Sequence, residues 1–262
     1  MRAVVVEEVG GPEQLVVREL PDPVAQNGQQ LVEVGAAGVN YADVLIRGGR
    51  YPQPPALPFV PGSEVAGTTG DGRRVLGLVR QTGGGYAERV VVDDDWLVDL
   101  PPDSTFSEGA AFPLAFLTAW IPLVHQARVR PGSSVLVTAA AGGVGSAAIQ
   151  VARALGAEVV AAVGSPDKHE LPRSLGASQV VGYDDIETLD PVDAVLDMVG
   201  GPLYATTLKR VKPLGTTIAV GFAGGSWEPI DPALLVGRNV AATGFFLGRL
   251  LQLQPALVRQ AL

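Results

Sequence analysis

The residues best suited to chemistry form one glycine-rich segment in the middle of the chain. An apolar run over 135–137 is followed by Ala140, Gly142 and Gly145, which occupy the three positions of an A-x-G-x-x-G pattern at the start of a helical run. Free N–H groups at such a helix start, and glycines that let the backbone approach closely, bind a pyrophosphate. The next apolar run, 158–163, has the spacing of a second parallel strand. The segment therefore predicts a dinucleotide site, with a purely structural glycine turn as the alternative.

The end of the second predicted strand indicates which dinucleotide fits. An NAD site normally carries Asp or Glu there to bind the ribose hydroxyls, whereas this strand ends in Gly164 and Ser165, with Lys168 shortly after. Gly164 leaves room for a further phosphate, and the Ser165 hydroxyl and the Lys168 ammonium can both donate to it. These residues favour NADPH over NADH, although Lys168 taken alone is equally well explained as a solvated residue at a helix start.

The composition argues against several other kinds of chemistry. The chain of 262 residues has no Cys and only two His, so it can form neither a disulfide framework nor a thiolate zinc site, and a redox reaction would need an organic cofactor. The formal net charge of −8 argues against nucleic-acid binding. Two uncharged stretches, 109–127 and 131–152, reach spanning length, but Pro, Gly and polar residues interrupt them. With no signal-peptide pattern at the N-terminus, we expect a cytoplasmic protein without a membrane span or a metal.

The first hundred residues predict a small antiparallel β domain. Short runs rich in β-branched residues are bounded by Gly, Pro, Asp or Asn, as is typical of strands in a partly open barrel or sandwich. The runs are Arg2–Val6, Leu15–Arg18, Gln30–Val34, Arg74–Val79 and Tyr86–Val92. Between them, Asn40 precedes apolar residues at helical spacing, which predicts a short helix over 40–46 that stops at Gly48 and Gly49.

From Ser107 onward, apolar strands alternate with alanine-rich helices, which predicts a parallel sheet covered by helices on both faces. The predicted strands are Val135–Thr138, Glu158–Val163, Gln179–Val181, Val192–Leu196 and Thr217–Val220, and the clearest helices are Ser146–Leu155 and Leu203–Val211. The boundary between the two halves is predicted within 107–125, in a helical connection rather than a flexible linker.

Short motifs in a fixed order point to a family. They are Gly10–Glu13, Ala37–Asp43, Arg47–Pro52, Pro61–Gly67, Gly85–Glu88, Leu117–Ala119 and Ala139–Gly145. With these motifs, the chain resembles the zinc-independent quinone oxidoreductase (zeta-crystallin-like) branch of the medium-chain dehydrogenase/reductase superfamily. The resemblance implies an α/β protein with an N-terminal GroES-like β-barrel domain over 1–117 and a Rossmann doubly wound parallel sheet domain that binds NADPH over 118–247. Residues 248–262 would return toward the first domain.

The resemblance also implies roles for individual residues. Asn40 and Tyr51 are the implied catalytic residues: Asn40 would look toward the nicotinamide and the substrate, and Tyr51 would line the cofactor cleft. The cofactor-binding residues expected from the glycine-rich turn, the strand end and the resemblance together are Thr118, Gly142, Gly143, Val144, Gly145, Gly164, Ser165, Lys168, Tyr183, Gly221, Phe222, Ala223, Phe245, Phe246 and Leu247. Without the resemblance, Asn40 is most often a helix N-cap, Tyr51 is more often a loop-packing residue, and Asp43 is a structural residue of the first helical turn. By the resemblance, Glu64 matches a structural acid rather than a base.

Three segments are shorter than in the family. The turn between Gly67 and Arg74 replaces a longer hairpin, the stretch after Tyr183 is too short for the usual helix, and the family's closing helix and strands have no counterpart before Leu262. We therefore expect part of the substrate cleft to be open or to be completed by another subunit. A late strand within 239–247, near the sheet edge, would pair two subunits in a homodimer or would be a simple edge strand.

The resemblance implies an NADPH-dependent enzyme that transfers a hydride, without zinc, to a small-molecule substrate, either a quinone or an α,β-unsaturated carbonyl. Such acceptors stabilise the added charge by conjugation, so the protein has to supply orientation and a few polar contacts. Two other functions stay open. An enoyl thioester reductase of the polyketide or fatty-acid type would reduce enoyl thioesters but not quinones. A sensor or structural protein would bind NADPH and reduce no acceptor.

Overall fold

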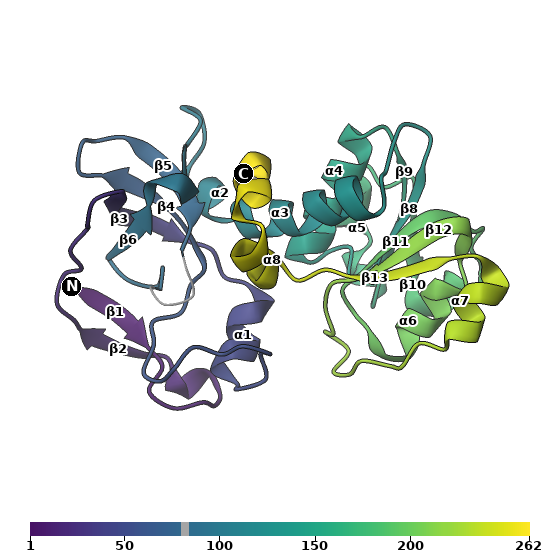
Figure 1. The fold of residues 1–262 in the computed structure, drawn as a ribbon, viewed down its shortest axis with the longest axis horizontal. Helices are drawn as coiled ribbons and strands as arrows, with labels where there is room; N and C mark the ends of the chain where they lie inside the picture. Colours follow the sequence, from purple (N-terminus) through teal and green to yellow (C-terminus); the bar gives the residue numbers. More distant parts are fainter. Residues whose placement is uncertain (80–83) are drawn as a thin grey trace. The chain divides into compact units, whose positions relative to one another are not determined.

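The computed structural model describes residues 1–79 and 84–262, which form two compact units (Figure 1). Unit 1 contains Met1–Leu114 together with Leu262, and unit 2 contains Ala115–Ala261. The division falls inside helix α3, Pro113–Ile121. The chain therefore passes from one unit to the next through a helix.

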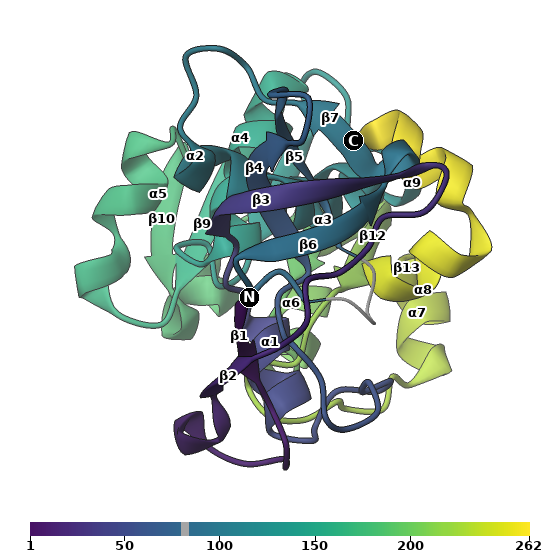
Figure 2. The same cartoon turned by 90° about the vertical axis from the view of Figure 1, so that its left-hand side faces the viewer.

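Unit 1 is built on a curled antiparallel sheet with the strand order β6-β3-β4-β5-β7 (Figure 2). The strands are β3 (Gln29–Ala37), β4 (Glu64–Thr69), β5 (Arg74–Leu78), β6 (Arg89–Asp93) and β7 (Leu97–Asp99). A separate antiparallel ribbon joins β1 (Arg2–Val5) to β2 (Val16–Glu19). The predicted antiparallel β domain is thus confirmed, and β4 and β7 are additions that the sequence pattern did not predict.

The helices of unit 1 are short and have recognisable caps. Helix α1, Tyr41–Arg47, follows Asn40 as predicted, and the Asp43 carboxylate accepts from the Asn40 backbone N–H at 2.8 Å. Helix α2, Phe106–Ala110, begins with a capping box between Thr105 and Glu108. Helix α2 packs on the sheet through Ala110, beside a buried cluster that includes Leu76 and Leu100. The sheet and α2 together form a core that holds β4 and its buried Glu64 in place.

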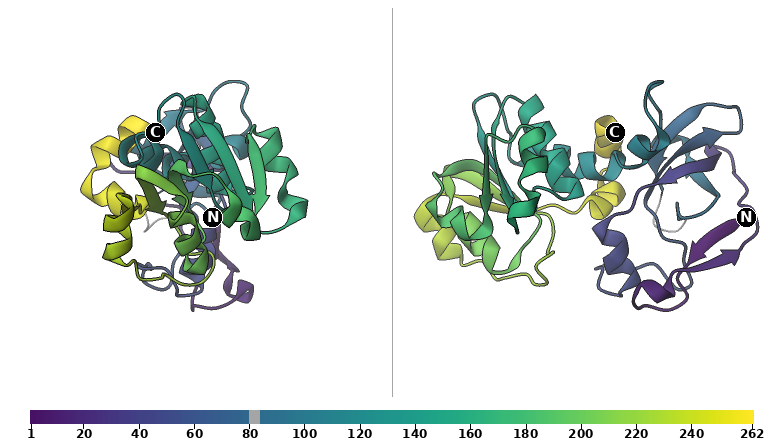
Figure 3. Two further views of the ribbon diagram at one scale, coloured as in Figure 1. Left: turned by 90° about the vertical axis from the view of Figure 1, so that its right-hand side faces the viewer. Right: turned by 180° about the vertical axis from the view of Figure 1, so that it is seen from behind.

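Unit 2 is a six-stranded parallel sheet with the order β10-β9-β8-β11-β12-β13 (Figure 3). The strands are β8 (Ser134–Val137), β9 (Glu158–Val163), β10 (Gln179–Gly182), β11 (Val192–Asp197), β12 (Val211–Ala219) and β13 (Ala241–Gly244). The chain runs outward in one direction from β8 to β10 and in the other from β11 to β13. A ligand-binding crevice in such a sheet lies at the carboxyl ends of the strands where the order reverses, which here is between β8 and β11.

Helices follow the strands of unit 2; the first four connect one strand to the next, and the last two come after the final strand, β13. They are α4 (Gly143–Ala154), α5 (Glu170–Ser174), α6 (Gly201–Leu208), α7 (Pro232–Arg238), α8 (Leu247–Leu253) and α9 (Pro255–Ala261). The stretch after Tyr183 forms only a 3-10 segment, Tyr183–Thr188, in agreement with the expectation that it is too short for a full helix. Residues 203–211 form α6 only as far as Leu208, because Val211 already pairs with Val192 as part of β12.

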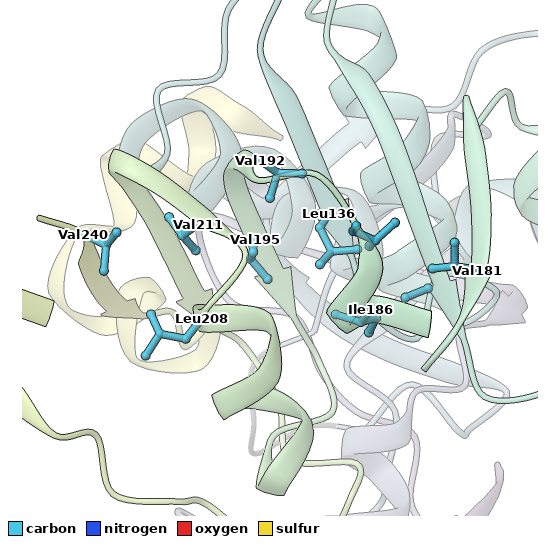
Figure 4. Close-up of a cluster of buried hydrophobic side chains, with 10 residues drawn as sticks. Leu136, Val181, Ile186, Val192, Val195, Leu208, Val211 and Val240 are labelled. Atoms are coloured by element: carbon cyan, nitrogen blue, oxygen red, sulfur yellow. The ribbon is translucent and has the colours of Figure 1, made fainter. Parts of the chain in front are cut away.

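One face of the parallel sheet is sealed by a cluster of buried aliphatic side chains (Figure 4). The cluster joins Leu136 of β8 and Val195 of β11 to Leu208 of α6 and Ile186 of the 3-10 segment, each at most 2% exposed. Fully burying one such side chain contributes roughly 1.5–3 kcal/mol, so this packing fixes the strands whose carboxyl ends carry the candidate site. Among the described residues, no helix combines the length and the apolar character needed to cross a membrane.

Candidate functional site

The glycine-rich turn joins the end of β8 to the start of α4. Ala139 has a φ of 46°, an uncommon conformation for a non-glycine residue, and its carbonyl accepts from the Gly142 N–H at 2.8 Å. Gly142 is the N-cap of the 12-residue helix α4, and Gly142 and Gly143 are exposed. The N–H groups of the first helical turn lack partners within the helix and lie at the positive end of its dipole. The turn can therefore bind an anion.

The glycines of this turn are required for different reasons. A Cβ at Gly145 would lie 2.3 Å from the Ala139 carbonyl oxygen and 2.7 Å from the Ala140 Cα, so Gly145 allows helix and strand to pack closely. A Cβ at Gly142 would meet only that oxygen, at 3.2 Å, and one at Gly143 would meet nothing within 4 Å. The described residues leave the space beside Gly142 and Gly143 open. The bare backbone there fits a cradle for an approaching phosphate, with Val144 half-buried behind it.

The predicted adenosine-phosphate residues come together at the ends of β9 and β10. A Cβ at Gly164 would lie 3.3 Å from the ring of Tyr183, so these two residues are neighbours. Burial raises the pKa of Tyr183, and a backbone hydrogen bond with Ala139 opposes that shift. Tyr183 thus links the ends of β9 and β10 to the glycine-rich turn. Lys168 is exposed in the 3-10 turn Pro166–Lys168.

Ser165 has a partner in this loop. A hydrogen bond from its side chain lowers the pKa of the exposed Asp167 carboxylate. The Ser165 hydroxyl is therefore held by Asp167 in this structure, and Lys168 is the more available donor to a phosphate.

A buried carboxylate lies at the point where the strand order reverses. The Asp197 side chain, 0% exposed, accepts from the Thr138 hydroxyl at 2.6 Å and from the Gly200 N–H at 2.8 Å. It also accepts from the Val199 N–H at 3.3 Å, and burial raises its pKa. Because Thr138 directly precedes the glycine-rich turn, Asp197 ties that turn to the loop after β11. Asp197 was not among the predicted site residues, although an acid that directly follows an apolar strand and precedes Gly200 and Gly201 is a signal that the sequence contains.

The residues predicted to flank the nicotinamide also lie at this edge of the sheet. The Gly221 and Ala223 N–H groups donate to the carbonyls of Asp197 and Met198, at 3.3 and 3.1 Å, so the loop after β12 lies along the loop after β11. Phe222 lies between them, and its ring is 5.3 Å from that of Trp227.

After β13, the Phe245 N–H donates to the Ala219 carbonyl at 2.9 Å; Phe245 and Leu247 are buried, and Phe246 is half-buried. Thr118, the remaining predicted cofactor residue, is buried in the middle of α3. The carboxyl ends of the parallel strands thus gather all the predicted cofactor residues except Thr118.

In unit 1, Asn40 belongs to a buried polar network. Its side-chain amide donates to Glu64 Oε1 at 2.7 Å, and the Leu114 N–H donates to Glu64 Oε2 at 2.7 Å. The Tyr86 hydroxyl donates to Asp43 Oδ2 at 3.0 Å, the same oxygen that accepts from the Asn40 N–H. Glu64 is 1% exposed and Asp43 is 7% exposed. Asn40 is therefore held by two carboxyl groups, one of them far from it in sequence.

Burial shifts the acidity of every titratable group in this network. Burial raises the pKa of Glu64 to about 7, with the nearby charge of Asp43 adding to the shift and the two hydrogen bonds opposing it. Burial also raises the pKa of Asp43 and of Tyr86. Burial and the Asp43 charge raise the pKa of Tyr51 to about 12. The phenol of Tyr51 consequently stays protonated at neutral pH and is suited to donating a hydrogen bond.

The raised pKa of Glu64 predicts a pH-dependent stability. Between the usual pKa of 4.5 and the folded value of about 7, the folded state binds more protons than the unfolded state, so stability falls as pH rises through this window. The variant Glu64→Gln cannot titrate. We expect the free energy of unfolding of the natural protein to decline relative to that of Glu64→Gln by up to about 3 kcal/mol from pH 4.5 to 8. Denaturant unfolding across this range measures the difference, and a constant difference would contradict it.

In the described part of the chain, no group of three or more His, Asp or Glu side chains is arranged to hold a metal ion. His125 is exposed and His169 is half-buried; they lie on different short helical segments. The polar groups that the structure brings together are instead the backbone donors of the strand ends in unit 2 and the Asn40 network in unit 1.

Two family models match the chain. The model of the alcohol dehydrogenase GroES-like domain matches residues 26–75, and that of the zinc-binding dehydrogenases matches residues 143–261. Quinone oxidoreductase of Mus musculus is 37% identical over 246 residues, which cover 86% of this chain and 74% of the mouse protein.

Solved structures agree with these matches. The quinone oxidoreductase from Thermus thermophilus, solved alone and in complex with NADPH, is 41% identical with a TM-score of 0.91, and the match covers 100% of this chain and 85% of that one. CurK enoyl reductase is 30% identical with a TM-score of 0.88 over 99% of this chain and 85% of that one. A glycine-rich turn on a parallel sheet, a GroES-like first unit and relatives of this similarity show that the chain belongs to the quinone oxidoreductase branch of the medium-chain dehydrogenase/reductase superfamily.

Proposed function

We propose that this protein is an NADPH-dependent oxidoreductase that reduces a quinone or an α,β-unsaturated carbonyl without zinc. The observation that carries the proposal is the edge of the parallel sheet, where bare glycine backbone at Gly142 and Gly143, the Gly164–Tyr183 pair and Lys168 follow three adjacent strands. The NADPH complex of the Thermus relative supports the same cofactor here. A chain without Cys supports a reaction that does not depend on a thiolate-bound zinc ion.

The residues present fit the parts of a bound dinucleotide. The first-turn N–H groups of α4 would hold the pyrophosphate, because a Cβ at Gly142 or Gly143 would meet no side chain of the described residues within 4 Å. Tyr183 and Gly164 would line the adenosine pocket, and Lys168 would pair with the additional phosphate. The loops at 221–223 and 245–247 would present backbone groups to the nicotinamide end. When bound, NADPH supplies the hydride.

In unit 1, the candidate groups for the acceptor are hydrogen-bond donors rather than strong acids. The Asn40 amide donates one N–H to Glu64 and retains a second N–H, while its carbonyl oxygen faces the Asp43 N–H in the capping box of α1. The Tyr51 phenol stays protonated at neutral pH. Such donors would stabilise negative charge that develops on a carbonyl oxygen during reduction. With no strongly acidic donor among these groups, we propose that the final proton comes from solvent.

The acceptor class is tested with a panel of quinones, enones and enoyl thioesters. We expect NADPH oxidation with quinones or enones, and the purified protein is assayed with each acceptor at saturating NADPH. Activity on enoyl thioesters alone would favour the function suggested by the likeness to CurK enoyl reductase. Tight NADPH binding without reduction of any acceptor would instead support a sensor or structural protein.

The cofactor preference gives a second prediction. Removing the ammonium of Lys168 should weaken NADPH binding by about tenfold or more, because a charge-assisted contact with the extra phosphate is lost, and should leave NADH binding unchanged. A fluorescence titration of Lys168→Ala with each cofactor measures this. Lys209→Ala is the matched control, since Lys209 is also exposed and lies at the end of α6, away from the strand-end loops. An equal loss of affinity for NADPH and for NADH would show that Lys168 does not contact the additional phosphate.

A homodimer is part of the proposal. Strand β13 ends the parallel sheet, and its outer edge has no partner strand among the described residues. Such an edge can pair with the same edge of a second copy. Light scattering coupled to size-exclusion chromatography should give twice the mass of 27.1 kDa, and a monomer mass at micromolar concentration would exclude the dimer.

A further inference from the structure

The carboxyl group of Glu64 is enclosed and fully engaged. Each of its oxygens accepts a hydrogen bond of 2.7 Å, one from the Asn40 amide and one from the Leu114 N–H. A Cβ at Gly38 would lie 2.3 Å from Glu64 Oε1 and 2.4 Å from the Ala110 carbonyl oxygen, so the glycine leaves room for the carboxyl group. Glu64 is thus a buried acid, 1% exposed, with both carboxyl oxygens hydrogen-bonded.

The two donors to Glu64 differ in their freedom. The Leu114 N–H belongs to the backbone at the start of α3 and can only donate. The Asn40 amide can turn over about its terminal bond, so that either its NH₂ group or its oxygen faces Glu64. Ionised Glu64 accepts from both partners. Protonated Glu64 must donate its O–H, and the Asn40 oxygen is the acceptor that becomes available when the amide turns over.

We propose that Glu64 is a positioning residue whose charge state sets the orientation of the Asn40 amide. Ionised Glu64 holds the amide nitrogen, with the amide oxygen toward the Asp43 N–H in the capping box, whereas protonated Glu64 holds the oxygen and turns both N–H groups away from Glu64. The proton that Glu64 gains or loses exchanges with solvent, and no other bond changes. The inference rests on the proposed function only in its consequence, because Asn40 would then present donors to the acceptor carbonyl when Glu64 is protonated.

The change falls in an accessible pH range, since burial brings the pKa of Glu64 to about 7. The titratable groups that interact with Glu64 are Asp43 on α1 and Tyr86 before β6, and Tyr51 after α1 interacts with Asp43. From α3, Glu64 accepts from the Leu114 N–H, and from α2 the Ala110 carbonyl oxygen lies, like Glu64 Oε1, against the Gly38 backbone. Asp43 is therefore the neighbouring acid whose titration has to be separated from that of Glu64, and the variant Asp43→Asn serves that purpose.

The first test needs no substrate or cofactor. The side-chain NH₂ resonances of Asn40 are followed by NMR in the natural protein from pH 5 to 9. We expect one titration step with a midpoint near neutrality, retained in Asp43→Asn and in the matched control Glu33→Gln, whose glutamate is exposed on β3. In Glu64→Gln the step should vanish, because glutamine satisfies the Leu114 N–H with its oxygen and the Asn40 oxygen with its NH₂ group. Asn40 resonances that do not respond to pH in the natural protein would overturn the proposal.

The second test measures the consequence for the reaction. In the natural protein, kcat/KM for the acceptor should change by roughly tenfold across the same midpoint, while the Kd for NADPH should not. In Glu64→Gln the step should be absent and the rate should match the low-pH rate of the natural protein. A step retained in Glu64→Gln, or an NMR titration with no kinetic counterpart, would overturn the positioning role. If the natural protein reduces no acceptor, the proposed function fails, and the NMR experiment still decides whether Glu64 orients Asn40.

Discussion

Replacing Asp197 by alanine should lower the stability of the protein by about 3–5 kcal/mol. The substitution removes the acceptor of three donors, the Thr138 hydroxyl and the N–H groups of Val199 and Gly200, at a position that is 0% exposed. For a protein of this size, such a loss lowers the thermal midpoint by about 10 °C. NADPH affinity should fall as well, because Thr138 leads into the glycine-rich turn. Differential scanning calorimetry and a cofactor titration measure the two effects.

Asp190→Ala is the matched control for Asp197→Ala. Asp190 is exposed just before β11, at the opposite end of the strand from Asp197, so its removal should change stability by no more than about 0.5 kcal/mol. Thr138→Val gives a partial version of the effect, since it removes one of the three donors together with the acceptor of the Met198 N–H. A thermal midpoint of Asp197→Ala equal to that of Asp190→Ala would show that water replaces the carboxylate at the strand ends.

The cofactor half of this protein could be predicted from sequence because its signals are local. The glycine pattern, the apolar strand before it and the helix after it lie within some twenty residues. Gly145 is required by the close packing of helix on strand, and this requirement appears in the sequence as a residue type. Strand β9 was predicted with its observed bounds, Glu158–Val163. The carboxyl ends of parallel strands lie at one edge of the sheet. The predicted strands therefore also indicated that the loops following them lie close together.

The Asn40 network could not be predicted in the same way. Its members come from three separate segments, and Glu64 lies 24 residues from Asn40 while Tyr86 lies 43 residues from Asp43. Asn40 alone fits a helix N-cap, and the structure does place it there, yet its side-chain amide donates to Glu64. Only the pairing of β4 with β3, at Val65 and Ala37, brings the two residues together. Local sequence patterns do not indicate such a contact between distant segments.

Two strands of unit 1, β4 and β7, were not predicted from the sequence, and each lacks the usual signal for a different physical reason. Strand β4 is buried on both faces along most of its length, so it lacks the alternation of apolar and polar residues that indicates a strand. It also contains Gly67, where a Cβ would lie 2.1 Å from the Glu33 carbonyl oxygen, so glycine is required by close strand contact. Strand β7 has three residues, too few for any periodic signal. The unrecognised β4 is the element that carries Glu64.

Substitutions in the glycine-rich turn should give the second large effect. Replacing Gly145 should mainly lower stability, whereas replacing Gly142 should mainly weaken NADPH binding. Gly145→Ala places a methyl group 2.3 Å from the Ala139 oxygen and against backbone that cannot move without separating α4 from β8. We expect a loss of about 3 kcal/mol in stability, with weakened NADPH binding as a consequence. Gly142→Ala meets only one atom at 3.2 Å, so its thermal midpoint should stay within a few degrees of the natural protein.

Its NADPH affinity should nevertheless fall by about tenfold or more, because the added methyl group separates the phosphate from the backbone N–H groups of α4. The two variants thus dissociate folding from binding, and thermal unfolding with and without NADPH measures both in one experiment. Gly70→Ala, in the exposed turn between β4 and β5 where a Cβ meets nothing within 4 Å, is the control for the substitution itself. If Gly142→Ala bound NADPH as tightly as Gly70→Ala, the pyrophosphate would have to lie elsewhere, and the glycine pattern would serve only the packing of helix on strand.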